Sequence, residues 1–363
     1  MQPKAITYVQ AKSDENWLTR LSAVRLITIV FIAAGYASTM PDGPASDEWL
    51  SHLGYQPSWI GIQILFLFSG ALALRSLQAG RYGWAYLKSR ILHIAPYLLG
   101  VTFLTVAVIY PLFADVKTMS ITELAGYFLT TVTCINPGQV MPGLLDNAPY
   151  ACLIQGSIWT LKWGLLFHII IALLGRVKPL FTPVFLLFCA VISTMLYGVT
   201  TYLAVKNEWE HLTPLITAMR LGYVFVIGMA LWAYRNHLPK RSTSNLVILL
   251  LLLGLAFSKF AFGPWSPIIE ISLCAFWGYF AWCLATSKHK ALAWMSNWPR
   301  LAALLYLINW PIAQILLMSF PQFEAQTLPV ISVPLTIVMA VLASQIRQIF
   351  KRQNTKNTLA LTP

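Results

Sequence analysis

Charged residues are scarce in this sequence. Asp, Glu, Lys and Arg together make up 10% of the 363 residues, whereas hydrophobic residues make up 58%. A soluble domain carries about 25% charged residues, because its surface must be hydrated. The low charge, with a mean hydropathy of +0.66, therefore excludes a soluble fold and indicates an integral membrane protein.

The familiar motifs of metal, phosphate and serine-esterase sites are also missing. The chain has no His-x-x-x-His pair, no cysteine cluster, no paired carboxylates, no Gly-rich phosphate loop and no Gly-x-Ser-x-Gly sequence. Each of these patterns brings together the ligands or the nucleophile that its chemistry needs. We therefore expect no metal site and no bound cofactor.

Long apolar runs dominate what is present, and a membrane-spanning helix needs about 20 apolar residues. The first run, residues 21–40, could also be a cleaved signal peptide, but Arg25 interrupts its apolar core, so we expect it to be retained. The sequence predicts an all-α integral membrane protein, a single bundle of about ten transmembrane helices. These are residues 21–40, 57–77, 91–113, 156–175, 181–204, 213–234, 244–262, 267–286, 301–320 and 328–348.

Acidic residues are half as numerous as basic ones, 12 against 25, which leaves a net charge of +13. Of the basic residues, 19 of the 25 fall in alternate connections and in the two tails, whereas nine of the 12 acidic residues fall in the other connections. By the positive-inside rule, both termini are therefore cytoplasmic. The basic charge is a topology signal that faces anionic membrane lipid, and we expect no nucleic-acid partner.

The chain reads as one domain without internal repeats. Residues 1–350 form the transmembrane domain, and residues 351–363 form a polar cytoplasmic tail. Most connections are short, but the outer loop at residues 114–155 has about 40 residues. A loop of this length on one face of a bundle is usually either functional or mobile.

Two features of this outer loop are informative. Ser120 and Glu123 form a capping box, which predicts a short helix that is apolar enough to lie at the membrane interface. Cys134 and Cys152 lie in the same loop. In an oxidising compartment they would either form a disulfide or remain two free thiols, and the sequence leaves both alternatives open.

Ionisable side chains within the predicted spans are rare, and each costs free energy to place in hydrocarbon. Arg220 and Glu270 lie at matching depths near the outer ends of their spans, which predicts an ion pair. Lys162 is the second choice as partner of Glu270, and its alternative is to snorkel to the lipid headgroups. His168 is a further titratable group inside a span.

Several stretches carry a family resemblance. RLITIVFIAAGY (25–36) is similar to an Arg-x10-His signature, and WIGIQILFLFSGALALRSL (59–77) to Gly-x-Asp-x-Phe-Phe-x-x-Ser-Gly-Phe. KSRILHIAPYLLG (88–100) is similar to Arg-Arg-x-x-Arg-Ile-x-Pro-x-Tyr. IWTLKWGLLFHIII and ALLYLINWPIAQILL are similar to Trp-Ser-Leu-x-x-Glu-x-x-Phe-Tyr and Tyr-Leu-x-His-x-Pro. In this order and spacing, the stretches resemble the integral-membrane acyltransferase family 3, over essentially the whole chain.

The resemblance implies O-acylation of a cell-envelope glycan or lipid-linked sugar at the bacterial inner membrane. It implies that acyl-CoA, most simply acetyl-CoA, is the donor substrate and is held near the cytoplasmic side by Arg25 and Arg90, with Lys88 and His93 of the same basic segment. It further implies that the acyl group is transferred near Tyr36, roughly 16 Å from Arg25 along one helix.

Ionisable residues of the family pattern are replaced in this chain. The histidine position holds Tyr36, the aspartate Gln63, the third arginine His93, the glutamate Gly164 and the late histidine Asn309. A phenol with a pKa near 10 is a poor general base at neutral pH. The retained residues are Arg25, Ser69, Gly70, Arg90, Pro96, Tyr97, Trp159, Tyr306, Trp310 and Pro311.

Three functions remain open. The first is a diverged O-acyltransferase, whose base is supplied by a residue such as His168 or Glu270. The second is a non-catalytic relative that retains the fold and either binds a lipid-linked glycan or partners an active enzyme or export machinery of the envelope polysaccharide. The third is a transporter, although the paired broken helices typical of transporters are not evident. The candidate site residues are Tyr36, Gln63 and His168 for catalysis, Arg25, Lys88, Arg90 and His93 for the donor, and Trp159, Lys162, Arg220, Glu270 and Asn309 for the acceptor or for structure.

Overall fold

The computed structural model describes residues 8–44, 46–48, 56–114, 119–238, 266–287, 295 and 301–360. Within these ranges the regular structure is helical and includes no strand. The helices are α1 (Tyr8–Thr39), α2 (Pro57–Gln78), α3 (Gly83–Leu104), α4 (Tyr110–Phe113), α5 (Ile121–Val132), α6 (Leu161–Leu174), α7 (Pro183–Asn207), α8 (Thr213–Ala233), α10 (Ser266–Thr286), α12 (Leu301–Ser319) and α13 (Thr327–Ala360). A π-helical turn, Thr105–Ile109, joins α3 to α4, and a 3-10 turn, Gly156–Thr160, precedes α6.

In the described part of the chain, nine helical segments are long and apolar enough to cross a membrane. They coincide with nine of the ten predicted spans and confirm a multi-pass helical membrane protein. The remaining predicted span, residues 244–262, lies outside the described residues.

Three helices extend well beyond the predicted boundaries. α1 begins at Tyr8 and α3 at Gly83, each ahead of its predicted span, and α13 continues to Ala360, through most of the predicted polar tail. The extensions of α1 and α13 are largely polar and that of α3 mixes polar with aromatic residues, and a formed helix propagates through such residues at little cost because nucleation has already occurred. The hydrophobic run therefore marks the membrane-crossing part of each helix but not its ends.

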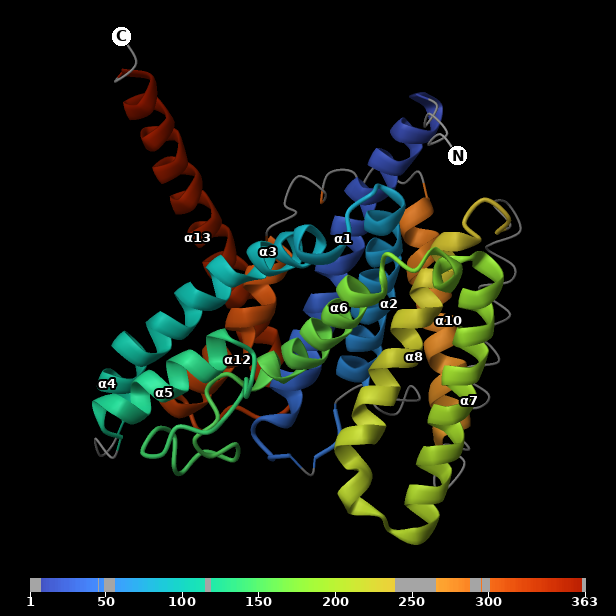
Figure 1. The fold of residues 1–363 in the computed structure, drawn as a ribbon. Helices are drawn as coiled ribbons and strands as arrows, with labels where there is room; N and C mark the ends of the chain where they lie inside the picture. The colour runs from blue at the N-terminus through green and yellow to red at the C-terminus, as the bar shows by residue number, and fades with distance from the viewer. Residues whose placement is uncertain are drawn as a thin grey trace.

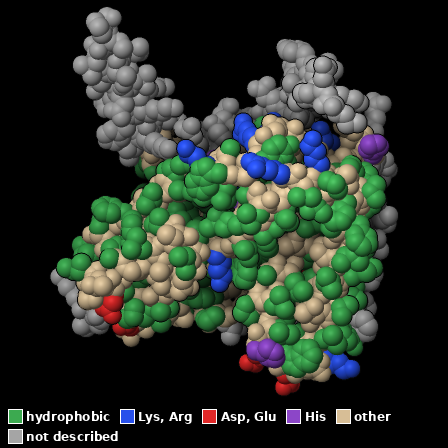
Figure 2. Space-filling view, viewed as in Figure 1, with side chains coloured by type: hydrophobic (Ala, Val, Ile, Leu, Met, Phe, Trp, Pro, Cys, Tyr) green, Lys and Arg blue, Asp and Glu red, His purple; other side chains and the backbone are tan. Residues whose placement is uncertain are grey.

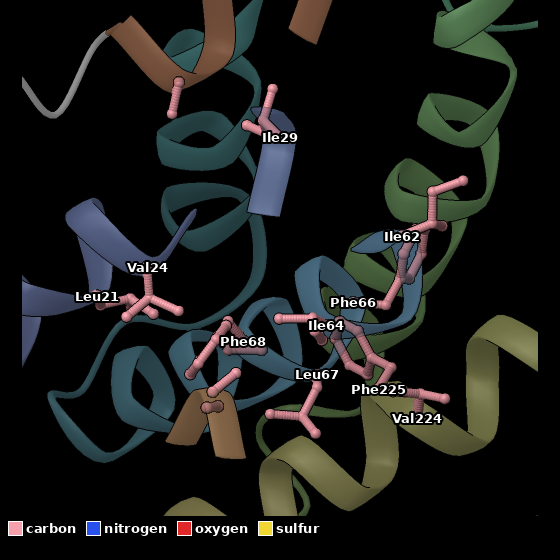
Figure 3. Close-up of a cluster of buried hydrophobic side chains, with 14 of the residues drawn as sticks. Leu21, Val24, Ile29, Ile62, Ile64, Phe66, Leu67, Phe68, Val224 and Phe225 are labelled. Carbon is pink, nitrogen blue, oxygen red and sulfur yellow. The ribbon is translucent and has the colours of Figure 1, made fainter. Parts of the chain in front are cut away.

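α2 lies at the centre of the bundle, where it packs against α1, α8 and α10. Most of its residues are apolar, and the buried ones lie on several faces, which is typical of a helix in the middle of a bundle. Figure 3 shows part of this core, in which Leu67 and Phe68 of α2 lie in one cluster with Leu21 of α1 and Phe225 of α8. α7 packs along α8 at the side of the bundle (Figure 1).

Two glycines allow α2 and α8 to cross closely. A Cβ atom added at Gly70 would overlap the carbonyl oxygen of Phe225, and one added at Gly228 would overlap the carbonyl oxygen of Leu67. Small residues commonly permit such close approaches between membrane helices. Gly70 therefore has a packing role that any larger side chain would disturb.

The outer loop is attached to the bundle by side chains of α12 and of the π-helical turn. Trp310 Nε1 donates to the Leu153 carbonyl at 3.0 Å, and Gln314 Nε2 donates to the same oxygen at 3.1 Å. Gln155 Nε2 donates to Thr105 Oγ1 at 2.8 Å. These bonds replace water for buried polar groups and hold the loop against the helices.

The predicted capping box is present at the start of α5. Ser120 Oγ accepts from the Glu123 amide, and the Glu123 carboxylate accepts from the Ser120 amide at 2.7 Å. Cys134 and Cys152 are free thiols in this structure, so the disulfide alternative is not observed.

Charge is distributed unevenly between the two ends of the bundle. α1 begins and α13 ends at the same end of the molecule (Figure 1). On the face shown in Figure 2, Lys and Arg gather mainly toward that end, while Asp and Glu lie at the opposite one. We call these the basic end and the acidic end. α2 and α8 both end at the basic end, where Trp232 Nε1 donates to Gln78 Oε1 at 2.9 Å.

Candidate functional site

A buried polar cluster lies where α2, α7, α8 and α10 meet, toward the acidic end. This Glu270 cluster consists of Gln63, Tyr197, Arg220 and Glu270. Arg220 Nε donates to Glu270 Oε1 at 2.5 Å, which is the ion pair predicted from the sequence. Gln63 Nε2 donates to the same oxygen, and the Tyr197 hydroxyl donates to Oε2 at 2.6 Å. These donors compensate a carboxylate that is only 4% exposed.

Aromatic rings surround the Glu270 cluster. The Arg220 guanidinium lies 3.5 Å from the centroid of the Trp59 ring, and Tyr223 stacks on Tyr197 with centroids 5.0 Å apart. Lys162, the second-choice partner of Glu270, is half-buried and lies over the ring of Trp163 at 5.1 Å. The structure therefore assigns the carboxylate to Arg220.

A row of aromatic side chains leads from this cluster to Tyr36 and then to the outer loop. The rings of Trp59 and Trp159 are 5.4 Å apart, and Trp159 Nε1 donates to the Tyr36 hydroxyl at 3.2 Å. Tyr36 contacts Trp310 edge-on at 5.1 Å, and Trp310 contacts Tyr150 at the same distance. Tyr36 therefore points into the protein and not toward lipid headgroups.

Tyr36 and Gln63 thus lie in two different clusters. Gln63 is 1% exposed and bonded to Glu270, whereas Tyr36 is half-buried against Trp159 and Trp310. The aromatic row connects them, because Trp59 contacts both Arg220 and Trp159. Both of the replaced motif positions are therefore occupied by side chains with fixed partners.

Tyr306 of α12 binds the 3-10 turn that precedes α6. The Tyr306 hydroxyl donates to the Ser157 carbonyl at 2.7 Å, and Ser157 Oγ donates back to the Tyr306 carbonyl at 3.0 Å. Thr160 Oγ1 lies 2.7 Å from the same Tyr306 hydroxyl. Asn309, which is 3% exposed, donates to the Tyr306 carbonyl at 2.6 Å. The structure gives Asn309 a bond within its own helix, which is a structural role.

Arginines gather toward the basic end in a group that we call the basic cluster. Arg90 Nη2 donates to the Leu72 carbonyl at 2.7 Å and to Ser76 Oγ at 2.5 Å. Arg25 is half-buried and near enough to Arg90 for the two charges to repel. The cluster consists of Arg25, Arg75, Arg81 and Arg90, the last being within electrostatic reach of the other three.

The basic cluster has no acidic counterpart among the residues that the structure describes. The salt bridge found in that part of the chain joins Arg220 to Glu270, well away from these arginines. Repulsion between buried like charges costs free energy, and an anion placed among them relieves it. Of the four residues predicted to bind the donor, Arg25 and Arg90 belong to the basic cluster. The other two, Lys88 and His93, are exposed on α3 and lie outside the cluster as defined here.

His168 lies between Ser69 and Tyr86. Its Nε2 atom is 3.2 Å from Ser69 Oγ, and its Nδ1 atom is 2.6 Å from the Tyr86 hydroxyl. The guanidinium of Arg90 lies 5.3 Å from the centroid of the Tyr86 ring. Only the tautomer protonated at Nδ1 leaves Nε2 able to accept the Ser69 proton. Both ring nitrogens are engaged, so His168 resembles a satisfied histidine of the core more than an open base.

Two buried polar residues have no local signal in the sequence. Tyr197 lies within an ordinary apolar span, and Glu48 is one of several acidic residues assigned to the outer side. In the structure Glu48 is 4% exposed, and its carboxylate accepts from the Ser58 amide at 2.8 Å and from the Ser58 hydroxyl. Tyr197 and Glu48 each form their hydrogen bonds with a residue of another segment, which their local sequence does not indicate.

A pocket of about 270 Å³ lies between α6, α7 and α8. Its walls are apolar and include Phe167, Leu196 and Val226. Such walls suit hydrocarbon, since water needs two or more polar partners. Tyr223 is the titratable residue of the lining, which contains none of the predicted site residues.

Comparison of the chain with protein-family models, with curated proteins and with solved structures found no match in any of the three. What is shown is therefore a multi-pass helical membrane protein with one buried ion-pair cluster, one aromatic row and one basic cluster in its described part.

Proposed function

We propose that this protein is a membrane O-acyltransferase that moves an acyl group, most simply acetyl, from cytoplasmic acyl-CoA to a hydroxyl of a glycan or lipid-linked sugar outside. The observation that supports this most is the basic cluster, in which Arg25 and Arg90 are half-buried and form no salt bridge with a carboxylate of the described residues. A site of this kind suits phosphate groups, because guanidinium groups form strong charge-assisted bonds with them.

The geometry along α1 fits a donor that enters from one side and reacts near the other. Arg25 lies toward the basic end and Tyr36 toward the acidic end, roughly 16 Å further along the same helix. Coenzyme A combines anionic phosphates with a long flexible arm that ends in the thioester. With its phosphates at the basic cluster, the donor would place its thioester toward the aromatic row.

The aromatic row suits a sugar acceptor. Trp59, Trp159, Tyr36 and Tyr150 are half-buried and lie toward the acidic end, where an extracytoplasmic acceptor would arrive. Aromatic rings present an apolar face together with polar edges, which matches the two sides of a sugar ring. The membrane would be the bacterial inner membrane, and the partners would be its lipid and other envelope-polysaccharide proteins.

A second candidate function is favoured by a different observation. Gln63 is bonded to Glu270, and Tyr36 is enclosed by Trp159 and Trp310, so both positions are occupied by protein contacts. A protein with this arrangement could bind an acyl donor or a glycan without transferring a group. Such a non-catalytic protein would act as a partner or binding subunit in polysaccharide modification or export.

Turnover of labelled acetyl-CoA distinguishes the two functions. Membrane vesicles containing the full chain, supplied with the envelope glycan fraction of the host, should transfer label to the glycan. Arg25→Gln and Arg90→Gln should each raise KM for acetyl-CoA about tenfold, since a bond to a charged group contributes roughly 1.5–3 kcal/mol. Arg176→Gln is the matched control, because Arg176 is an exposed basic residue outside the cluster.

The two functions predict different results. If the protein binds acetyl-CoA without transferring label, and the Arg25 and Arg90 variants do not bind it, the non-catalytic function is favoured. If neither binding nor transfer is seen with correctly inserted protein, both functions are wrong.

A further inference from the structure

Glu48 is a buried carboxylate toward the acidic end that belongs to neither the Glu270 cluster nor the basic cluster. Its side chain lies over the α-carbon of Gly35, where an added Cβ atom would overlap the carboxylate. Oε2 accepts from the Ser58 amide at 2.8 Å, and Oε1 accepts from the Ser58 hydroxyl. Each oxygen has a second lone pair, so the group can accept a further proton.

The position of Glu48 relates it to the aromatic row. Gly35 is the chain neighbour of Tyr36, and the charge of Glu48 acts electrostatically on the hydroxyls of both Tyr36 and Tyr150. The carboxylate therefore lies beside the row and toward the end where an acceptor hydroxyl would arrive. His168 is placed differently, since its partner Tyr86 also contacts Arg90 of the basic cluster.

The surroundings of Glu48 make it a stronger base than an ordinary glutamate. Burial raises the pKa of Glu48, and the two bonds from Ser58 oppose this only in part. Ser58 from α2 and the phenols of Tyr36 and Tyr150 are the groups that act on it in the described part of the chain, and none is a cation. Glu270 differs, because Arg220 bonds directly to its carboxylate.

We propose that Glu48 is the general base and acid of the acyl transfer, a role that rests on the proposed function. The Glu48 carboxylate accepts the proton of the acceptor hydroxyl as that oxygen bonds to the thioester carbonyl carbon. The carbon–sulfur bond then breaks, and the departing thiolate of coenzyme A takes the proton from Glu48. One O–C bond forms, one C–S bond breaks, and Glu48 returns to its starting state.

A purely structural role for Glu48 makes different predictions. A carboxylate that only binds the N-terminal turn of α2 should affect folding and not the pH dependence of turnover. We would therefore measure kcat and KM for labelled acetyl-CoA in vesicles over a pH series, for wild type, Glu48→Gln, Ser58→Ala and Glu210→Gln. Glu210 is an exposed glutamate toward the same end and serves as the control.

We expect Glu48→Gln to lower kcat about 100-fold or more, the usual contribution of a general base, with KM for acetyl-CoA unchanged. Wild-type kcat should rise with pH as Glu48 loses its proton, and this rise should vanish in Glu48→Gln. In Ser58→Ala the rise should move to higher pH, because the bond from the Ser58 side chain lowers the pKa of Glu48.

Ser58→Ala keeps the experiment decisive if Glu48→Gln fails to accumulate. An unchanged pH profile in Ser58→Ala, or turnover within threefold of wild type in Glu48→Gln, would overturn the role of Glu48 while leaving the acyltransferase function intact. Absence of turnover in the wild type would instead overturn the proposed function, and this inference with it.

Discussion

Among single residues, the carboxylate of Glu270 has the most demanding surroundings. It is 4% exposed and receives bonds from Gln63, Tyr197 and Arg220 on three other helices. A charge in this position is tolerated only because its partners replace water. Removing the carboxylate or one of its donors therefore leaves a buried polar group without this hydrogen-bond partner, and water does not readily replace it.

We expect Glu270→Ala to destabilise the protein by about 3–5 kcal/mol, because it leaves a buried guanidinium without this carboxylate. Thermal unfolding in detergent would show a lower Tm than for Glu210→Ala, an exposed control. The double variant Arg220→Met with Glu270→Leu should recover much of the loss, since it removes both charges. Equal Tm values for Glu270→Ala and wild type would contradict the role of the pair.

The reactivity of the Cys152 thiol in the outer loop depends on its neighbour Asp146. Burial, and to a smaller extent Asp146, whose Oδ1 accepts from Sγ at 2.9 Å, together raise the pKa of the Cys152 thiol to about 11. Asp146→Asn should therefore lower this pKa and increase the rate of iodoacetamide labelling at pH 8 several-fold, because the thiolate reacts.

Cys134 is the internal control for this experiment. Burial alone raises the pKa of Cys134, so its labelling rate should not respond to Asp146→Asn. Peptide mapping by mass spectrometry reports both rates in one sample. An equal change at both cysteines would indicate loosening of the loop instead of loss of the Asp146 charge.

At the scale of whole helices, the crossing of α2 and α8 decides how close their polar residues approach. Gly70 and Gly228 each contact a carbonyl of the opposite helix, so the two backbones touch without intervening side chains. Gln63 and Arg220, on these same two helices, both bond to Glu270 Oε1. A wider crossing would separate donors that must converge on one oxygen.

We expect Gly228→Ala to destabilise the bundle by about 1–3 kcal/mol, because the added Cβ forces the backbones apart. Gly100→Ala is the matched control, since a Cβ there would meet nothing within 4 Å. It should be neutral or slightly stabilising, because alanine has the higher helix propensity. Thermal unfolding of both variants in one detergent measures the difference; a Tm loss in the control and not in Gly228→Ala would refute the packing role.

For the molecule as a whole, the orientation in the membrane is the central prediction. The basic end contains the start of α1 and the end of α13, and the basic charge there should face the cytoplasm. A phosphatase that is active only outside the cytoplasm should be inactive when fused after Pro363. The same phosphatase inserted after Asn136 of the outer loop should be active, and the opposite pair of results would invert the topology.

The membrane class, nine of the spans and the capping box of α5 follow from the amino-acid sequence, because hydrophobicity and capping depend on residues close in the chain. The sequence also predicted the Arg220–Glu270 pair from matching depths in two spans. Tertiary structure alone decided that Gln63 and Tyr197 join this pair, that Tyr36 lies between two tryptophans, and that Glu48 is buried over Gly35. These contacts depend on the rotation of each helix about its axis and on which helices are neighbours. A span that is apolar with little periodicity does not indicate which of its faces points inward or which helix it packs against.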